Sequence, residues 1–193
     1  RRQRQMCIRD SLTVRHLANL LGKLNALRGA VISAQLHLWP FHHLLKSALA
    51  RSSWTGLTAL DPPVIEEMRW WHDEMQGWSG KSIIPVRSQM VVTTDASSHG
   101  WGGWWRQFGH SGTLRNEARG FWLPKEQGMS SNARELSGVL LTVQAALPAL
   151  RNKQVLVETD NKKTQAYINH LGGRSRFLNG IARKLWTMCY SNH

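Results

Sequence analysis

The sequence predicts an α/β protein in which an all-helical segment precedes a mixed sheet with the element order βββαβα. In the first part, leucines from Leu17 to Leu27 recur at the spacing of one helix face. After Gly80, short runs rich in valine, threonine and tryptophan alternate with turn residues, which is typical of strands. Between the third and fourth runs, apolar residues from Leu136 to Leu147 form one stripe of a long helix.

Residues 11–88 are predicted to form three helices. The first is capped by Thr13 and ends at Gly29. The second must break or kink at Pro40, because proline has no backbone N–H to donate. The third runs from about Pro63 to Gly77, after a good helix start at Asp61. Three tryptophans are interpreted as core residues between domains rather than as a surface for stacking bases, namely Trp70, Trp71 and Trp78.

Residues 89–193 are predicted to form the sheet and the helices that cover it. Three strands with short connections indicate an antiparallel meander, at Met90–Asp95, Gly102–Gln107 and Glu117–Trp122. After them we expect a helix from about Ser131 to Leu147, a fourth strand at Val155–Val157, a helix ending at Gly172 and a basic helix at Phe177–Tyr190.

The formal charge of the chain, +13 in total, is distributed unevenly. Residues 1–51 carry +8, residues 52–124 carry −1 and residues 125–193 carry +6. Two basic ends around a nearly neutral middle favour a polyanionic partner, above all nucleic acid, over a basic protein that is merely soluble.

Cysteine content and hydropathy exclude several classes of protein. The two cysteines, Cys7 and Cys189, form neither a disulfide framework nor a CxxC metal cluster. Such sparse thiols are typical of a reducing, intracellular setting. The apolar runs are too short for a membrane span, so we expect no membrane partner.

Three acidic residues stand out by their place in the predicted elements. Asp95 ends the first strand, Asp160 follows the fourth strand, and Glu135 lies in the long helix. If those two strands are parallel neighbours, the three carboxylates converge and repel one another unless cations bind between them. Oxygen ligands favour two Mg²⁺ or Mn²⁺ ions, which can activate water against a phosphodiester. The alternative is that the aspartates only cap turns and helices.

The motifs around these acids, taken in order, resemble those of ribonuclease H. They are Thr94-Asp95-Ala96-Ser97 with Gly100-Trp101-Gly102-Gly103, then Ser131-Asn132-Ala133-Arg134-Glu135-Leu136, then Thr159-Asp160-Asn161. The string Asp160-Asn161, Ala166-Tyr167-Ile168-Asn169 and Gly172-Gly173 is similar to reverse transcriptase–ribonuclease H polyproteins of DIRS-type retroelements. The resemblance implies metal-dependent endonucleolytic hydrolysis of RNA in RNA–DNA hybrids, with Asp95, Glu135 and Asp160 as catalytic metal ligands.

The resemblance also implies a domain organisation. Residues 11–88 resemble the connection (thumb-like) segment that joins polymerase to nuclease, and residues 89–193 resemble a ribonuclease H domain. The remainder of the polyprotein is an expected partner. The family's fifth strand and its fourth carboxylate would follow His193, so we expect a truncated domain with the fourth strand at an open edge of the sheet. Residues 1–10 resemble a translated sequencing adapter and are expected to be an artefact.

Further polar residues are candidates for contacts with nucleic acid. The resemblance implies contacts from Ser97, Asn132 and Asn161, and Asn132 alternatively caps the long helix. Four basic residues near the end of the chain either grip backbone phosphates or form a solvated helix face: Arg174, Arg176, Arg183 and Lys184. Two other functions stay open: a non-catalytic nucleic-acid-binding scaffold, and a recombinase or transposase of the same fold. The second is disfavoured because those proteins place Glu last among the acids.

Overall fold

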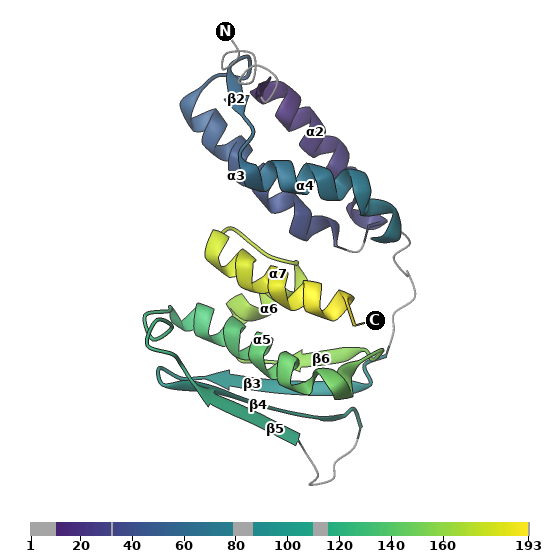
Figure 1. The fold of residues 1–193 in the computed structure, drawn as a ribbon, viewed down its shortest axis with the longest axis vertical. Helices are drawn as coiled ribbons and strands as arrows, with labels where there is room; N and C mark the ends of the chain where they lie inside the picture. Colours follow the sequence, from purple (N-terminus) through teal and green to yellow (C-terminus); the bar gives the residue numbers. More distant parts are fainter. Residues whose placement is uncertain (1–10, 32, 79–86, 110–115, 193) are drawn as a thin grey trace. The chain divides into compact units, whose positions relative to one another are not determined.

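A computed structural model describes residues 11–31, 33–78, 87–109 and 116–192 (Figure 1). The chain divides into two compact units, Arg1–Ile83 and Ile84–His193. Residues 1–10, which the sequence assigns to an adapter, lie outside the described residues. None of the helices in the described ranges is long and apolar enough to cross a membrane.

The first unit contains a small sheet that the sequence analysis did not predict. Strand β1 (Ser11–Thr13) pairs antiparallel with β2 (Leu57–Ala59). The expectation of an all-helical segment is therefore wrong in this detail. Strands of three residues are too short to show the alternation that marks a strand, and these two are brought together only by the helices between them.

The helices of the first unit begin close to where the sequence places them. Helix α2 (Val14–Ala26) is capped by Thr13, whose Oγ1 accepts a hydrogen bond from the N–H of His16 at 3.2 Å. A short 3-10 helix, η1 (Leu27–Gly29), follows α2. Helix α4 (Pro62–Asp73) is capped by Asp61, and a second 3-10 helix, η2, spans Met75–Trp78.

Helix α3 (Ala34–Arg51) continues through Pro40, so of the predicted break or kink the break is wrong. Proline at this position removes the hydrogen bond to the carbonyl of Leu36, at a cost of about 3 kcal/mol. Leu38 and Phe41 on either side are fully buried in the core of the unit. Burial of such side chains stabilises the helix by a comparable amount, because each contributes about 1.5–3 kcal/mol.

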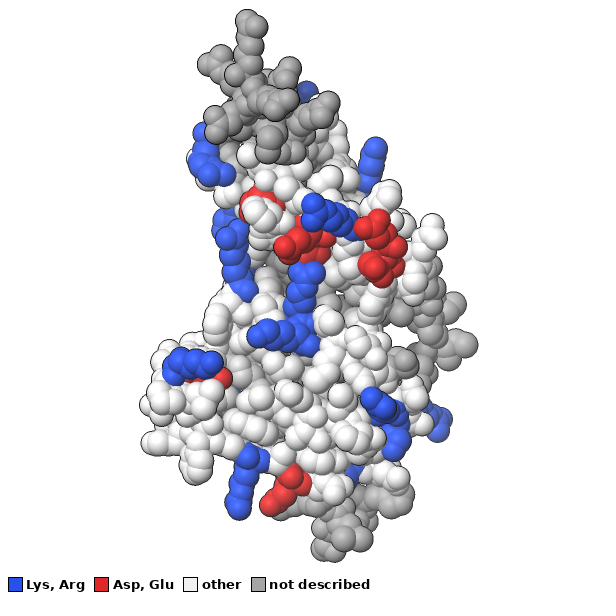
Figure 2. Space-filling view, viewed as in Figure 1, with Lys and Arg blue, Asp and Glu red and all other residues white. Residues whose placement is uncertain are grey.

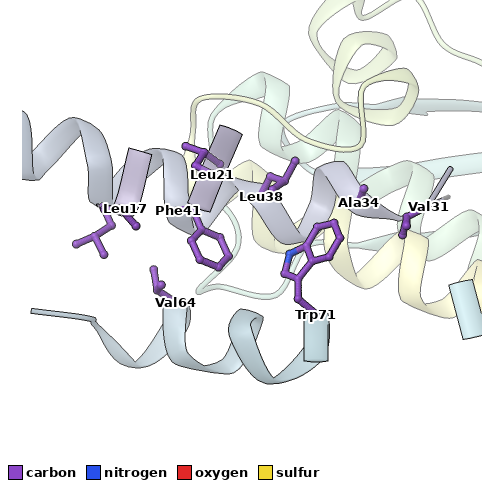
Figure 3. Packing of buried hydrophobic residues seen from close by; sticks show 9 residues of the cluster. Leu17, Leu21, Val31, Ala34, Leu38, Phe41, Val64 and Trp71 are labelled. Carbon is purple, nitrogen blue, oxygen red and sulfur yellow. The ribbon is translucent and has the colours of Figure 1, made fainter. Parts of the chain in front are cut away.

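The core of the first unit lies between α2, α3 and α4 (Figure 3). Leu17 and Leu21 of α2 belong to this cluster with Phe41 of α3, and Val64 and Trp71 project into it from α4. Partly buried tryptophans that pack against this cluster are Trp70 and Trp78. The three tryptophans therefore lie in or against the core of the first unit, and the expected position between domains stays a prediction.

The second unit is built on a four-stranded mixed sheet with the order β5-β4-β3-β6. Strands β3 (Met90–Ala96), β4 (Gly100–Gln107) and β5 (Asn116–Phe121) form the predicted antiparallel meander. Strand β6 (Val155–Glu158) pairs parallel with β3 and lies at an edge of the described sheet, as expected.

Three helices lie on the same side of this sheet (Figure 1). They are α5 (Ser131–Leu150), α6 (Lys162–Asn169) and α7 (Arg176–Tyr190). Helix α5 packs on β3 and β4, where Val139 and Val143 meet Val92 and Trp105. The second unit is therefore a mixed α/β fold, as the sequence predicts, with β3, β4, β5, α5, β6, α6 and α7 in chain order.

Candidate active site

Asp95, near the end of β3, and Asp160, just after β6, lie at the same end of the sheet. The parallel register pairs Thr93 of β3 with Glu158 of β6, and each aspartate lies two residues further along its strand direction. The Thr93 hydroxyl donates to Glu158 Oε2 at 2.7 Å, which ties the two strands together beside the aspartates. Both aspartate side chains are exposed.

Glu135 joins these aspartates from the first turns of α5. The helix begins after Ser130, whose Oγ accepts a hydrogen bond from the N–H of Ala133 at 3.3 Å. The N–H of Ala96 donates to Asp95 Oδ1 at 2.8 Å and also hydrogen-bonds the Glu135 carboxylate. Two carboxylates that share one N–H donor must lie next to each other.

The electrostatic environment of Glu135 is unfavourable for its charged form. Burial raises the pKa of the Glu135 carboxyl, and the negative charges of Asp95 and Asp160 raise it further. The Ala96 N–H and the Arg134 guanidinium act in the opposite direction. Glu135 is only 7% exposed, and its Oε2 has no hydrogen-bond partner among the described residues. Such an orphaned carboxylate oxygen beside two further acids is a position that a cation would stabilise.

The donor set of the three acids suits a hard cation, since carboxylate oxygens are the ligands that Mg²⁺ and Mn²⁺ prefer. Within the described ranges, however, no group of three His, Cys, Asp or Glu side chains is arranged to hold a metal ion. The three carboxylates are thus brought near one another at the carboxyl ends of β3 and β6, and their joint role as metal ligands stays a prediction.

Two hollows flank Asp95. The larger, about 840 Å³, runs along β3, β4 and β5 and is lined by His99, Arg119 and Phe121 among others. The smaller, about 540 Å³, lies between Asp95 and Asp160 and is also lined by Glu158 and Gln165. Sequence reasoning missed Glu158, the last residue of β6, because its place beside Thr93 follows from the register of an edge strand.

The Ser97 side chain shapes the turn after β3. Its Oγ accepts hydrogen bonds from the N–H of His99 at 3.2 Å and of Gly100 at 3.1 Å. The Ser97 carbonyl accepts a further bond from Trp122 Nε1 at 2.9 Å. Ser97 therefore fixes the hairpin that carries Asp95 toward the site.

Asn132 and Asn161 are hydrogen-bonded to each other near the acids, with Asn161 Nδ2 donating to Asn132 Oδ1 at 3.2 Å. Asn161 is the N-cap of α6. Asn132 is not the cap of α5, because Ser130 holds that position. The alternative that Asn132 caps the long helix is wrong.

The four basic residues that are candidates for phosphate contacts lie just before α7 or within it. Its buried stripe includes Leu178 and Ile181, which pack with Leu136 of α5, so α7 begins beside the first turns of α5 that carry Glu135. Arg174 and Arg176 are exposed at this beginning, whereas Arg183, which is half-buried, and the exposed Lys184 lie about two turns further along. On the face viewed in Figure 2, Lys and Arg side chains are spread over both units.

Comparisons with known proteins give no family. Neither the models of protein families nor the curated proteins contain a match to this chain. Among solved structures, the chain is similar to a foamy viral protease-reverse transcriptase in complex with RNA/DNA hybrid, with a TM-score of 0.37 and 13% identity over 93% of this chain. It is also similar to a dRH form of that protein in complex with ds DNA (TM-score 0.35, 13% identity, 93% of this chain), and to the protein in complex with dsDNA (TM-score 0.32, 15% identity, 90% of this chain).

The chain covers 23%, 30% and 37% of those three solved chains, respectively. Scores this low, at these identities, do not establish a shared family.

Proposed function

We propose that this chain is a divalent-cation-dependent nuclease of the ribonuclease H type that hydrolyses the RNA strand of RNA–DNA hybrids. The observation that carries the proposal is the meeting of Asp95, Glu135 and Asp160, where Glu135 is buried and feels the charge of both aspartates. Their order on strand, helix and strand agrees with the motif resemblance to reverse transcriptases of DIRS-type retroelements, with residues 11–88 as the connection segment.

The three carboxylates would hold two Mg²⁺ or Mn²⁺ ions. Bound there, the cations would lower the pKa of a water molecule and neutralise charge on the phosphodiester. The chain's own residues prepare the place: the Ala96 N–H aligns Asp95 and Glu135, and the pairing of β3 with β6 brings Asp160 alongside. The exposed aspartates are free to adjust their side-chain torsions around a cation.

Substrate contacts in this proposal come from polar side chains around the acids. Asn132, one turn before Glu135, faces the site from α5 and would contact the RNA strand. Arg174 and Arg176 would contact backbone phosphates close to the acids, and Arg183 and Lys184 further along α7. Ser97 would act through the turn that it stabilises.

A second candidate function is a non-catalytic scaffold that binds nucleic acid. It is favoured by one observation, namely that no three-ligand metal group is preformed among the described side chains. The basic charge of the chain serves binding in either case.

Cleavage of a labelled RNA–DNA hybrid in the presence of Mg²⁺ or Mn²⁺ tests the proposal. We expect cleavage of the RNA strand only, and its loss in Asp95→Asn, because the amide removes an anionic ligand at nearly unchanged volume. Asp73→Asn, the same replacement at an exposed position of α4 in the first unit, is the matched control and should cleave normally.

Binding measured on the same proteins separates the two candidates. Hybrid binding without cleavage by the unmutated chain at any Mg²⁺ or Mn²⁺ concentration would favour the scaffold. Cleavage that persists in Asp95→Asn would reject the assignment of these acids.

A further inference from the structure

The side chain of Asn161 has two hydrogen bonds that join different parts of the candidate active site. Asn161 directly follows Asp160 and caps α6, since its Oδ1 accepts a hydrogen bond from the N–H of Thr164 at 2.8 Å. Its Nδ2 donates at 3.2 Å to Oδ1 of Asn132, which is 29 residues away in the sequence. One residue therefore connects the end of β6, the start of α6 and the start of α5.

This connection lies between two of the three acids. Asn132 is three residues before Glu135, which places both on the same side of α5 about one turn apart. Asp160 is covalently next to Asn161. The Asn161–Asn132 hydrogen bond thus spans from the segment of Asp160 to the helix of Glu135.

The segment that carries Asp160 has little other support from the sheet. Strand β6 has four residues and, within the sheet that the structure describes, pairs with a single neighbour, β3. The residues after it are held locally, because Gln165 Nε2 donates to the carbonyl of Thr159 at 2.6 Å and the N–H of Asn161 donates to Thr159 Oγ1 at 3.3 Å. These bonds stabilise the bend between β6 and α6 but do not reach α5.

We propose that Asn161 is a positioning residue of the cation site, which keeps Asp160 aligned with Glu135 through Asn132. The assignment rests on the proposed function, because it requires the acids to bind cations together. It differs from the direct nucleic-acid contact that the sequence resemblance implies for Asn161. Oδ1 and Nδ2 of Asn161 each have a partner within the chain, so the side chain is used for internal alignment.

The variant Asn161→Ser removes the hydrogen bond to Asn132 and keeps the one that caps α6. Serine is as good an N-cap as asparagine, so the start of α6 is preserved, but its side chain is too short to reach Asn132. Asn132→Ala removes the same link from the other side. The matched control is Asn169→Ser, which makes the same replacement at an exposed position at the end of α6.

Mn²⁺ binding to the full chain without nucleic acid is the primary measurement, followed by the Mn²⁺-induced shift in Tm. We expect Asn161→Ser to weaken Mn²⁺ binding roughly tenfold, as loss of an outer partner of a metal site does, with a Tm in metal-free buffer close to that of the unmutated chain. Asn132→Ala should weaken Mn²⁺ binding to a similar extent, and the double variant should be no weaker than either single variant. Hybrid cleavage by Asn161→Ser should show a lower kcat with little change in KM.

Unchanged Mn²⁺ binding in Asn161→Ser, or fully additive losses in the double variant, would overturn the positioning role and leave the proposed function intact. A lowered Tm in metal-free buffer with an unchanged Mn²⁺ affinity would also overturn it, since capping alone would then explain Asn161. Absence of Mn²⁺ binding and of cleavage in the unmutated chain would overturn the proposed function together with this inference.

Discussion

Glu135 is the residue whose ionisation is least compatible with its surroundings. Its side chain is buried, one carboxylate oxygen has no partner among the described residues, and Asp95 and Asp160 repel its charge. Because the pKa of Glu135 is raised in the folded chain, the folded state holds the proton more tightly than the unfolded state. The stabilisation is complete below the ordinary glutamate pKa and is lost as the pH rises through the raised value.

We therefore predict that Glu135→Gln stabilises the chain at neutral pH in metal-free buffer. The neutral amide removes the repulsion, and the free energy of unfolding should rise by about 1 kcal/mol. Thermal melts from acid to neutral pH should show a weaker pH dependence for the variant, and Mg²⁺ should raise its Tm less than that of the unmutated chain. Glu117→Gln, at an exposed position in β5, should change neither property. A lower neutral-pH Tm for Glu135→Gln would contradict the assigned cause.

Among the helices, α3 and α4 are joined by a buried pair of ionisable side chains. His37 Nδ1 and Glu67 Oε2 are 2.6 Å apart, and Glu67 is only 1% exposed. The His37 ring also stacks on Trp70, with ring centroids 3.4 Å apart. Removing either side chain of this pair should lower the free energy of unfolding strongly, because the remaining polar group stays buried without its partner.

Glu67→Ala is predicted to destabilise the chain by about 3 kcal/mol, while Glu67→Gln should cost less than half of that because the amide keeps a hydrogen bond to His37. Chemical denaturation followed by circular dichroism gives both values. Equal losses in the two variants would mean that volume, and not the polar pair, determines the stability.

Most elements could be predicted because their signals are local. The stripe of α5, the caps Thr13 and Asp61, and the meander of β3, β4 and β5 all depend on neighbouring residues. Two features could not be predicted, because tertiary packing decides them. They are the two-stranded sheet of β1 and β2 and the continuity of α3 through Pro40. A pattern within ten residues carries no information on contacts made fifty residues away.

The candidate site shows the same limit at the scale of the whole molecule. The acids could be chosen because Asp95 and Asp160 end adjacent parallel strands. The Asn161–Asn132 bond and the place of Glu158 could not, because they depend on how the start of α6 meets α5 and on the register of an edge strand. Side-chain pairs between separate elements are fixed only when the whole unit has folded.

Strand β6 determines how copies of this molecule are expected to interact with one another. It is an edge strand of the described sheet, and Leu156 within it is 40% exposed. An exposed edge with apolar side chains is a template for pairing with another chain, and natural proteins often place lysine at such edges to prevent it. The predicted consequence is concentration-dependent association of copies through β6.

Leu156→Lys should therefore reduce association, because each copy would bring a charge to the edge that has to be desolvated when two strands pair. Leu49→Lys is the matched control, since Leu49 is equally exposed, at 39%, but lies on helix α3. Light scattering and sedimentation over a range of protein concentrations, at salt high enough to screen the basic charge, would measure the effect. We expect the apparent association constant to fall roughly tenfold for Leu156→Lys, as 1.4 kcal/mol of lost pairing free energy gives, and to stay unchanged for Leu49→Lys. Equal effects of the two lysines would show that net charge controls association and that the β6 edge does not.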